Sequence, residues 1–238
     1  MTEPANQTQS ERYRNAVLIA TGIVVIAWFV PGLAVLTVPV NYLGTHVHEM
    51  SHALVAMATG AQNIVVSVHA DGSGLTESRG GSALLTSSAG YLGATAAGTA
   101  LLAASRTEAG ARRALGVFAV LLGVSSLLWL RGDLVGLLTG LGWLGVRAWL
   151  STKAQGGVLL FAAQFLGLQL CVASIQSLFT LLNVSALNMG FSDAQNMADL
   201  TGIPALFWAL LWCGVSLVGI VATLRHAWGR GRRSPGGS

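Results

Sequence analysis

Long apolar runs alternate with short polar stretches along most of the chain. The first run covers residues 16–40 and contains Pro31 and Pro39, which predict a kink or an early end. Five further apolar runs follow, at residues 83–104, 114–130, 134–150, 158–182 and 203–224. A helix needs about 20 apolar residues, with about 17 as the lower limit, to cross a bilayer. The pattern therefore predicts an all-α polytopic membrane protein.

The segment at residues 41–59 differs from these runs. It mixes apolar residues with His46, His48, Glu49 and His52, so that six transmembrane segments become seven if it crosses the bilayer. Residues 64–68 then alternate in character, and Asp71-Gly72-Ser73-Gly74 is typical of a turn. We expect a short strand or β-hairpin at the membrane surface after this segment.

Composition narrows the class of protein. Of the 238 residues, 53% are hydrophobic and only 9% are charged, and the mean hydropathy is +0.64. Soluble domains carry about 25% charged residues. This chain therefore has too few charged residues to cover the surface of a soluble protein. The values exclude a disordered chain and a basic nucleic-acid binder. We expect the lipid bilayer as a partner and no nucleic acid.

The distribution of charge predicts organisation and sidedness. A polar N-terminal tail at residues 1–15 is expected to be disordered, and a basic, Gly-rich tail at 225–238 is expected to be flexible. Residues 16–224 are left as the membrane-embedded domain. Basic clusters at residues 106–113, 147–153 and 225–233 are each separated by two predicted spans, so they share one side. The positive-inside rule makes that side, with the C-terminus, cytoplasmic. We expect the protein in the plasma membrane of its cell.

Small residues predict close helix contacts. Gly132, Gly136 and Gly140 recur every four positions on one helix face. A second such surface is made by Ala89, Gly90, Gly93, Ala94, Ala97 and Gly98. Small residues let transmembrane backbones approach closely.

The candidate chemistry lies in His48-Glu49-Met50-Ser51-His52, which fits the pattern His-Glu-x-x-His. On a helix, positions i and i+4 lie on the same face, so the two imidazoles can bind one Zn²⁺. The glutamate between them can act as a general base toward a water molecule. Ionisable residues inside a membrane segment are costly and are usually functional. The motif therefore predicts a zinc hydrolase.

A catalytic zinc needs a third protein ligand and an open position. The chain has few acidic residues, and two of them, Asp193 and Asp199, lie in the polar loop at residues 183–202. We expect this loop on the same side as the hairpin. Asp193 and Asp199 both stay candidates for the third ligand, and helix capping by Ser192 or Asp193 is the alternative to a ligand role.

The motif and its surroundings resemble the site-2 protease family of intramembrane zinc metalloproteases. The matching residues are His48-Glu49-Met50-Ser51-His52-Ala53-Leu54, Asp71-Gly72-Ser73-Gly74-Leu75-Thr76, Ala89-Gly90-Tyr91-Leu92-Gly93 and Ser192-Asp193-Ala194. They are similar to a compact bacterial branch without a PDZ domain. The resemblance implies His48, His52 and Asp193 as zinc ligands and Glu49 as general base. Better-known members have an Asp-Gly motif on a transmembrane helix, whereas the only Asp-Gly here, Asp71-Gly72, lies in the predicted hairpin.

On this interpretation the substrate is a transmembrane protein whose helix must be unwound before cleavage. The alternating segment Ile64–Val68 is suited to hold an extended substrate by β-augmentation. Two other functions are considered: a catalytically inactive homologue acting as a membrane scaffold, and a small transporter of metal ions or protons. The lack of an internal repeat disfavours transport, and Glu49 between two histidines favours hydrolysis. The sequence does not predict an oligomeric state.

Overall fold

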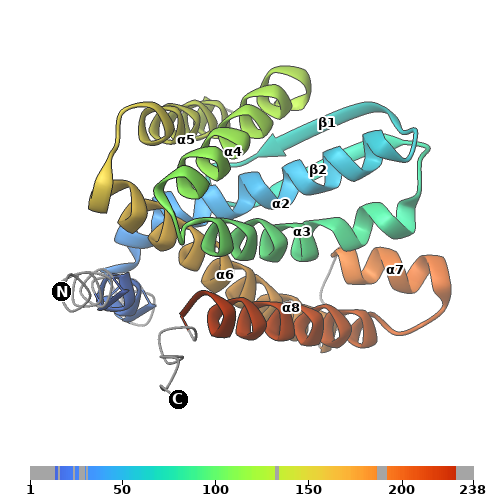
Figure 1. Ribbon diagram of the computed structural model, residues 1–238. Coiled ribbons are helices and arrows are strands. Elements are labelled where there is room, and N and C mark those ends of the chain that lie inside the picture. Colours follow the sequence, from blue (N-terminus) through green and yellow to red (C-terminus); the bar gives the residue numbers. More distant parts are fainter. Residues whose placement is uncertain are drawn as a thin grey trace, which may run out of the picture.

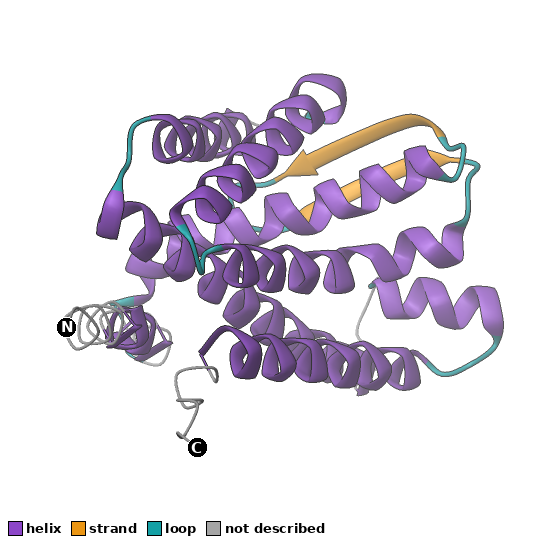
Figure 2. Cartoon of the chain, in the orientation of Figure 1, coloured by secondary structure: helices purple, strands orange, loops and turns teal. Residues whose placement is uncertain are grey.

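The computed structural model describes residues 14–15, 17–23, 25–26, 30, 32–131, 134–186 and 192–228. Within these residues the chain is mostly helical, with one small two-stranded sheet (Figures 1 and 2). The predicted tails at 1–15 and 225–238 lie largely outside the described residues. Of their described positions, residues 14–15 are helical and residues 225–228 continue the last helix, so that helix extends beyond its predicted end at 224.

The apolar run at residues 16–40 does not form one helix over its described positions. Residues 17–23 are helical, a 3₁₀ turn follows at Ala34–Thr37 (η1), and helix α2 begins at Val38 and ends at Ala58. Pro39 lies in the first turn of α2, where a proline costs no helical hydrogen bond. Gly60 follows the helix with φ +88°, the left-handed conformation that ends many helices. The histidine motif therefore lies in the middle of α2.

The predicted hairpin is confirmed. Strand β1 (Gln62–Val68) pairs antiparallel with β2 (Gly74–Arg79). Side chains of α2 hold the turn between them: the Tyr42 hydroxyl donates to the carbonyl of Ala70 and the Thr45 hydroxyl to that of Gly72, both at 2.7 Å. The hairpin is thereby fixed along α2.

The two edges of this sheet differ. Beyond β1, Val66 forms a parallel bridge with Leu130, and the N–H of Arg131 donates to the Val66 carbonyl at 2.7 Å. In the described part of the chain, β2 has no strand on its outer side. The free edge of the sheet is therefore β2.

Helix α3 (Ala83–Ala104) is the central element. It packs against α2, α6 (Gly156–Ala186) and α8 (Ala205–Trp228), and small residues mark these contacts (Figure 1). A Cβ on Gly98 would lie 2.9 Å from the Cys171 nitrogen and 2.9 Å from the Gly167 carbonyl oxygen of α6. A Cβ on Gly93 would overlap the Ser51 side chain of α2. The predicted small-residue surface on α3 therefore lies at two helix contacts.

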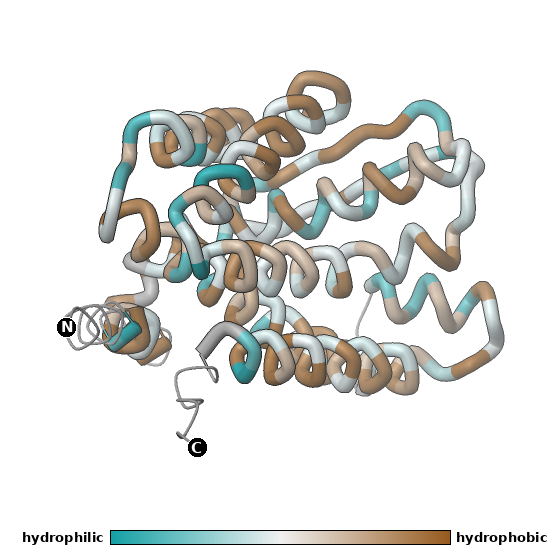
Figure 3. Tube along the Cα trace, in the orientation of Figure 1, coloured by the Kyte–Doolittle hydropathy of each residue, from teal (hydrophilic) through white to brown (hydrophobic). Residues whose placement is uncertain are grey.

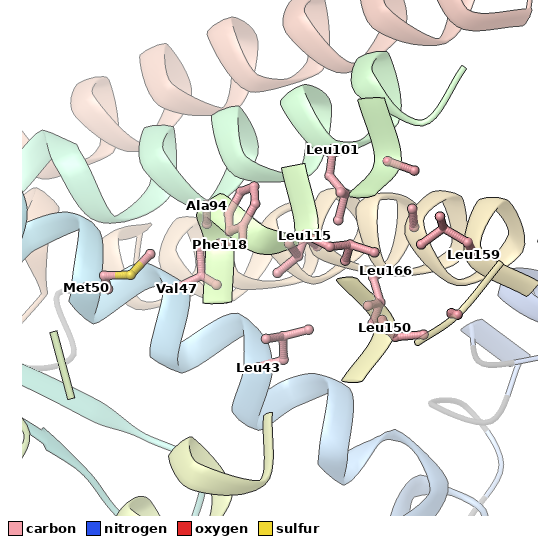
Figure 4. Packing of buried hydrophobic residues seen from close by; sticks show 14 residues of the cluster. Leu43, Val47, Met50, Ala94, Leu101, Leu115, Phe118, Leu150, Leu159 and Leu166 are labelled. Carbon is pink, nitrogen blue, oxygen red and sulfur yellow. The ribbon is translucent and has the colours of Figure 1, made fainter. Parts of the chain in front are cut away.

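The second predicted glycine face lies on α5 (Leu134–Thr152). Gly136 faces the Val68 backbone of β1, and Gly140 faces the His46 ring. Gly132 lies outside the described residues. Helix α5 pairs with α4 (Glu108–Trp129), and their buried side chains join those of α2, α3 and α6 in the main core, part of which Figure 4 shows. Its fully buried members include Leu43, Val47, Leu101, Leu115 and Leu159.

Four described helices are long and apolar enough to cross a membrane: α4, α5, α6 and α8. Figure 3 shows that hydrophobic residues predominate along these helices, whereas α7 (Asp193–Thr201) is more polar. Helix α3, which the sequence predicts as a span, is not among the four, because serine, threonine and glycine dilute its apolar character. The prediction of six or seven crossings is not confirmed.

Arg147 changes the charge pattern read from the sequence. This residue of α5 is 0% exposed, and its Cζ atom lies 5.2 Å from the centroid of the Phe118 ring. Its guanidinium has no hydrogen-bond partner among the described residues. It therefore cannot be counted as a loop charge. The cluster at residues 147–153 keeps only Lys153 as an exposed base, and the cytoplasmic placement of the C-terminus stays a prediction.

We predict that Gly98→Ala destabilises the protein by about 1–3 kcal/mol, because the new methyl group meets backbone atoms of α6 that cannot move aside. Gly214→Ala on α8 is the matched control, since no atom lies within 4 Å of its added Cβ. There the change is expected to be neutral or stabilising by up to about 1 kcal/mol. Thermal unfolding of both variants in one detergent tests this, and equal midpoints would contradict it.

Candidate metal centre

The two histidines of the motif lie one turn apart on α2 and present their rings to the same point. The Nε2 atoms of His48 and His52 are 3.0 Å apart, and the rings meet edge to face. His52 and Glu49 are buried, whereas His48 is half-buried. The spacing of four residues on a helix produces this arrangement.

Asp193 approaches the histidines from the other end of the chain. Its Oδ2 atom lies 3.2 Å from Nε2 of His48 and 3.2 Å from Nε2 of His52. Asp193 is the first residue of α7, a helix inside the stretch predicted as a polar loop. The capping function belongs to Ser192, whose hydroxyl accepts the N–H of Gln195. The Asp193 carboxylate is therefore free to face the histidines.

Asp199, the other predicted candidate, lies outside this cluster. It is exposed on the last turns of α7, where its carboxylate accepts a hydrogen bond of 2.8 Å from Gln195. Of the two aspartates, the structure brings only Asp193 to the histidines.

The hydrogen bond of His52 to α3 directs a ring lone pair toward the point where the three candidate ligands meet. The Nδ1–H of His52 donates to the Thr86 carbonyl at 2.6 Å, so the lone pair of a neutral His52 lies on Nε2, toward Asp193. The three ligand atoms all lie within 4.8 Å of one another and can hold a metal ion. A cation among them offsets the repulsion between their lone pairs.

Glu49 lies beside this cluster and is held by the hairpin. The Thr76 hydroxyl of β2 lies 2.6 Å from Oε2 of Glu49 and donates to it. A Cβ on Gly74 would lie 2.6 Å from Oε1 and 2.6 Å from Cγ of Glu49, so β2 passes too close for any side chain there. The carboxylate therefore has a fixed position next to the possible metal.

Helix α3 forms the opposite wall. A Cβ on Gly90 would overlap the His48 and His52 rings at Nε2, so only glycine lets α3 approach this closely. The next residue, Tyr91, places its ring edge to face on His48, with 4.6 Å between centroids. The ligand histidines are thus enclosed between two helices.

A cavity of about 600 Å³ opens from this cluster. His48, Asp193 and Tyr91 line it, together with the hairpin residues Gly72–Leu75. Helix α6 contributes Leu170, Ala173, Ser174, Gln176, Ser177, Thr180, Leu181 and Val184. The cavity is therefore bounded by the metal cluster, the hairpin and α6.

Sequence reasoning missed several contacts of this site. Thr76 and Tyr91 lie in segments that carry the family resemblance, but no spacing rule assigns them a partner. Thr86 acts through its backbone carbonyl, which has no sequence signal. His46, the third histidine of α2, points to α5, where its Nε2 lies 3.0 Å from the Thr139 hydroxyl.

Comparison with known proteins gives one family match. The family described as Peptidase M50B-like matches residues 19–223. This range includes α2, the hairpin, α7 and the apolar helices α4, α5 and α6, together with most of α8. This match confirms the resemblance to site-2 proteases indicated by the motifs. Neither the curated proteins nor the solved structures include a significant match.

We predict that Asp193→Ala weakens metal binding, because it removes one of the three ligand atoms. The loss of affinity is expected to exceed the factor of about 10–100 that removal of an outer-shell partner costs. Asp199→Ala is the control, since that exposed carboxylate bonds only to its own helix. Zinc content after dialysis against a competing chelator, together with the thermal shift on adding Zn²⁺, measures this. Full zinc retention in Asp193→Ala would contradict the ligand assignment.

Proposed function

Since the chain belongs to the peptidase M50B-like family, we propose that it is an intramembrane zinc metalloprotease that hydrolyses peptide bonds of transmembrane proteins. The family is one of metallopeptidases, and four apolar helices indicate an integral membrane protein. The observation that carries the proposal is the convergence of His48, His52 and Asp193 beside Glu49.

The donor set supports zinc as the metal. Two imidazole nitrogens and one carboxylate oxygen are typical of catalytic zinc sites, which keep a fourth position open. Zinc bonds of about 2.0–2.1 Å place tetrahedral ligand atoms about 3.3 Å apart. The distances of 3.0 and 3.2 Å between the three atoms are close to this value.

Zinc held by these residues would supply Lewis acidity, which activates water as a nucleophile and polarises the scissile carbonyl. Glu49 takes one proton from the attacking water as its oxygen bonds to the carbonyl carbon. Glu49 then delivers that proton to the amide nitrogen as the carbon–nitrogen bond breaks. Thr76 orients the carboxylate for both transfers through its hydrogen bond to Oε2. The cavity gives a peptide access to His48 and Asp193.

We place substrate pairing on β2. The expectation that Ile64–Val68 pairs with the substrate is not supported, because β1 has β2 on one side and Leu130 on the other at Val66. The outer edge of β2 is free in the described part of the chain, and Gly72–Leu75 line the cavity. An unwound transmembrane segment added to this edge would pass the metal cluster with its carbonyls exposed. The proposed partners are such a substrate and the lipid bilayer, in the plasma membrane of a bacterial cell with the C-terminus in the cytoplasm.

We predict that Glu49→Gln abolishes cleavage and keeps the zinc, because the amide cannot take the proton while the three ligand atoms stay in place. Zinc content and cleavage of single-span membrane proteins in proteoliposomes are measured side by side for wild type and variant. Zinc in the wild type without cleavage of any tested substrate would favour the inactive scaffold. Zinc or proton flux through the wild type, without cleavage, would favour the transporter.

We predict that Thr76→Val lowers kcat about 10-fold or more while zinc content and KM stay near the wild-type values. The substitution keeps the shape of the side chain and removes the hydroxyl that donates to Glu49. Thr152→Val on α5 is the matched control, because this threonine does not line the cavity and its hydroxyl bonds to its own helix at Ala148. Equal kcat for Thr76→Val and wild type would show that Glu49 does not depend on this hydrogen bond.

A further inference from the structure

Tyr91 lines the cavity and carries a hydroxyl group that can donate a hydrogen bond. Its ring lies against His48 of the metal cluster. Its ring meets His48 edge to face, and the residue lines the cavity together with His48 and Asp193. The carboxylates of Asp193 and Glu49 are the charged groups that act electrostatically on its phenol. Its hydroxyl therefore lies among the groups that the proposed reaction uses.

The Tyr91 hydroxyl has no hydrogen-bond partner among the residues that the structure describes; the hydrogen bonds of Tyr91 there are made by its backbone carbonyl. Three other donors of the cavity wall are engaged: Thr45 donates to Gly72, Asn41 to Thr37, and Ser73 to Asp71. Tyr91 differs from these three, because its hydroxyl has no partner in the described part of the chain and its ring contacts His48.

The ring of Tyr91 is held in place by packing against α8. It stacks on Trp212 of α8, with 5.6 Å between centroids and 20° between planes. Its backbone carbonyl accepts hydrogen bonds from the hydroxyls of Thr95 at 3.0 Å and Ser174 at 3.4 Å. Thr95 also bonds to Ser216, so three buried hydroxyls join α3, α6 and α8 at this point. These helices lie side by side in Figure 1.

We propose that Tyr91 is a catalytic residue whose hydroxyl donates a hydrogen bond to the oxygen of the scissile carbonyl as negative charge develops on it. The inference rests on the proposed function. When water adds to the carbonyl carbon, the carbonyl electron pair moves to oxygen, and the Tyr91 O–H stabilises that charge without giving up its proton. The pair returns as the carbon–nitrogen bond breaks. A donor fixed before the reaction acts at no cost of reorganisation.

The variant that tests this is Tyr91→Phe, which keeps the ring contacts with His48 and Trp212 and removes one oxygen. We expect unchanged zinc content and unfolding midpoint, an unchanged KM, and a kcat lower by about 10²–10³-fold, the usual loss for one oxyanion donor. Ser88→Ala is the control, because it removes an exposed hydroxyl of α3 that bonds only to its own helix at Leu84.

A binding measurement separates this function from general damage to the enzyme. The probes are a phosphinic pseudo-peptide, whose tetrahedral anionic group mimics the charged oxygen, and the matching amide peptide measured on a Glu49→Gln background. Tyr91→Phe is expected to weaken binding of the phosphinic compound about 10-fold or more and to leave the amide peptide unaffected. Equal losses for both probes would overturn the proposal.

The remaining outcomes distinguish this inference from the proposed function. An active wild type with a Tyr91→Phe variant of equal kcat overturns the inference and leaves the protease function standing. Loss of zinc in Tyr91→Phe also overturns it, because Tyr91 would then support His48 rather than the reacting oxygen. A zinc-loaded wild type that cleaves nothing and binds no phosphinic compound overturns both.

Discussion

The close approach of α3 to α2 at Gly90 is the constraint on which the rest of the site depends. Because position 90 has no side chain, the backbone of α3 lies directly against the His48 and His52 rings. The same contact brings the Thr86 carbonyl, one turn earlier, to Nδ1 of His52 and so selects the tautomer with a lone pair at the metal cluster. It also places Tyr91, the next residue, on the ring of His48. One helix contact therefore determines the spacing, the tautomer and the surroundings of both histidines.

Polar groups inside an apolar bundle must find partners, and this chain satisfies most of them by helix contacts. Thr95, Ser174 and Ser216 bond to one another where α3, α6 and α8 meet. The Glu49 carboxylate accepts a hydrogen bond from Thr76, and the carbonyls in the turn of the hairpin accept hydrogen bonds from Tyr42 and Thr45. Arg147 is the largest exception among the described residues, since its guanidinium lies over the Phe118 ring and has no hydrogen-bond partner there. Gln164, Gln169 and Ser185 each keep one buried side-chain oxygen without a partner among those residues.

The sequence predicts the parts of this structure that follow local rules. The spacing of His48 and His52 predicts a shared helix face, Asp71-Gly72 predicts the turn of the hairpin, and the small residues of α3 predict its close contacts. It does not predict which aspartate joins the histidines, because the position of α7 depends on packing far along the chain. Nor does it predict that Arg147 is buried, because its charge reads as a loop signal. The pairing of Thr76 with Glu49 joins residues 27 positions apart through the register of a hairpin, which no local pattern specifies.

Asp193 and Tyr91 depend on the same packing, although they lie on different helices. Ala194 and Met197 of α7 are fully buried in a cluster with Leu178 of α6 and Trp212 of α8, and Tyr91 packs against that cluster. The third ligand and the Tyr91 ring are thus positioned by one apolar unit, whereas the histidines and Glu49 are positioned by α2 and the hairpin. The two groups meet at the metal cluster. Binding a cation between His48, His52 and Asp193 therefore joins the two units, so that metal affinity and the packing of α7 against α8 are thermodynamically linked.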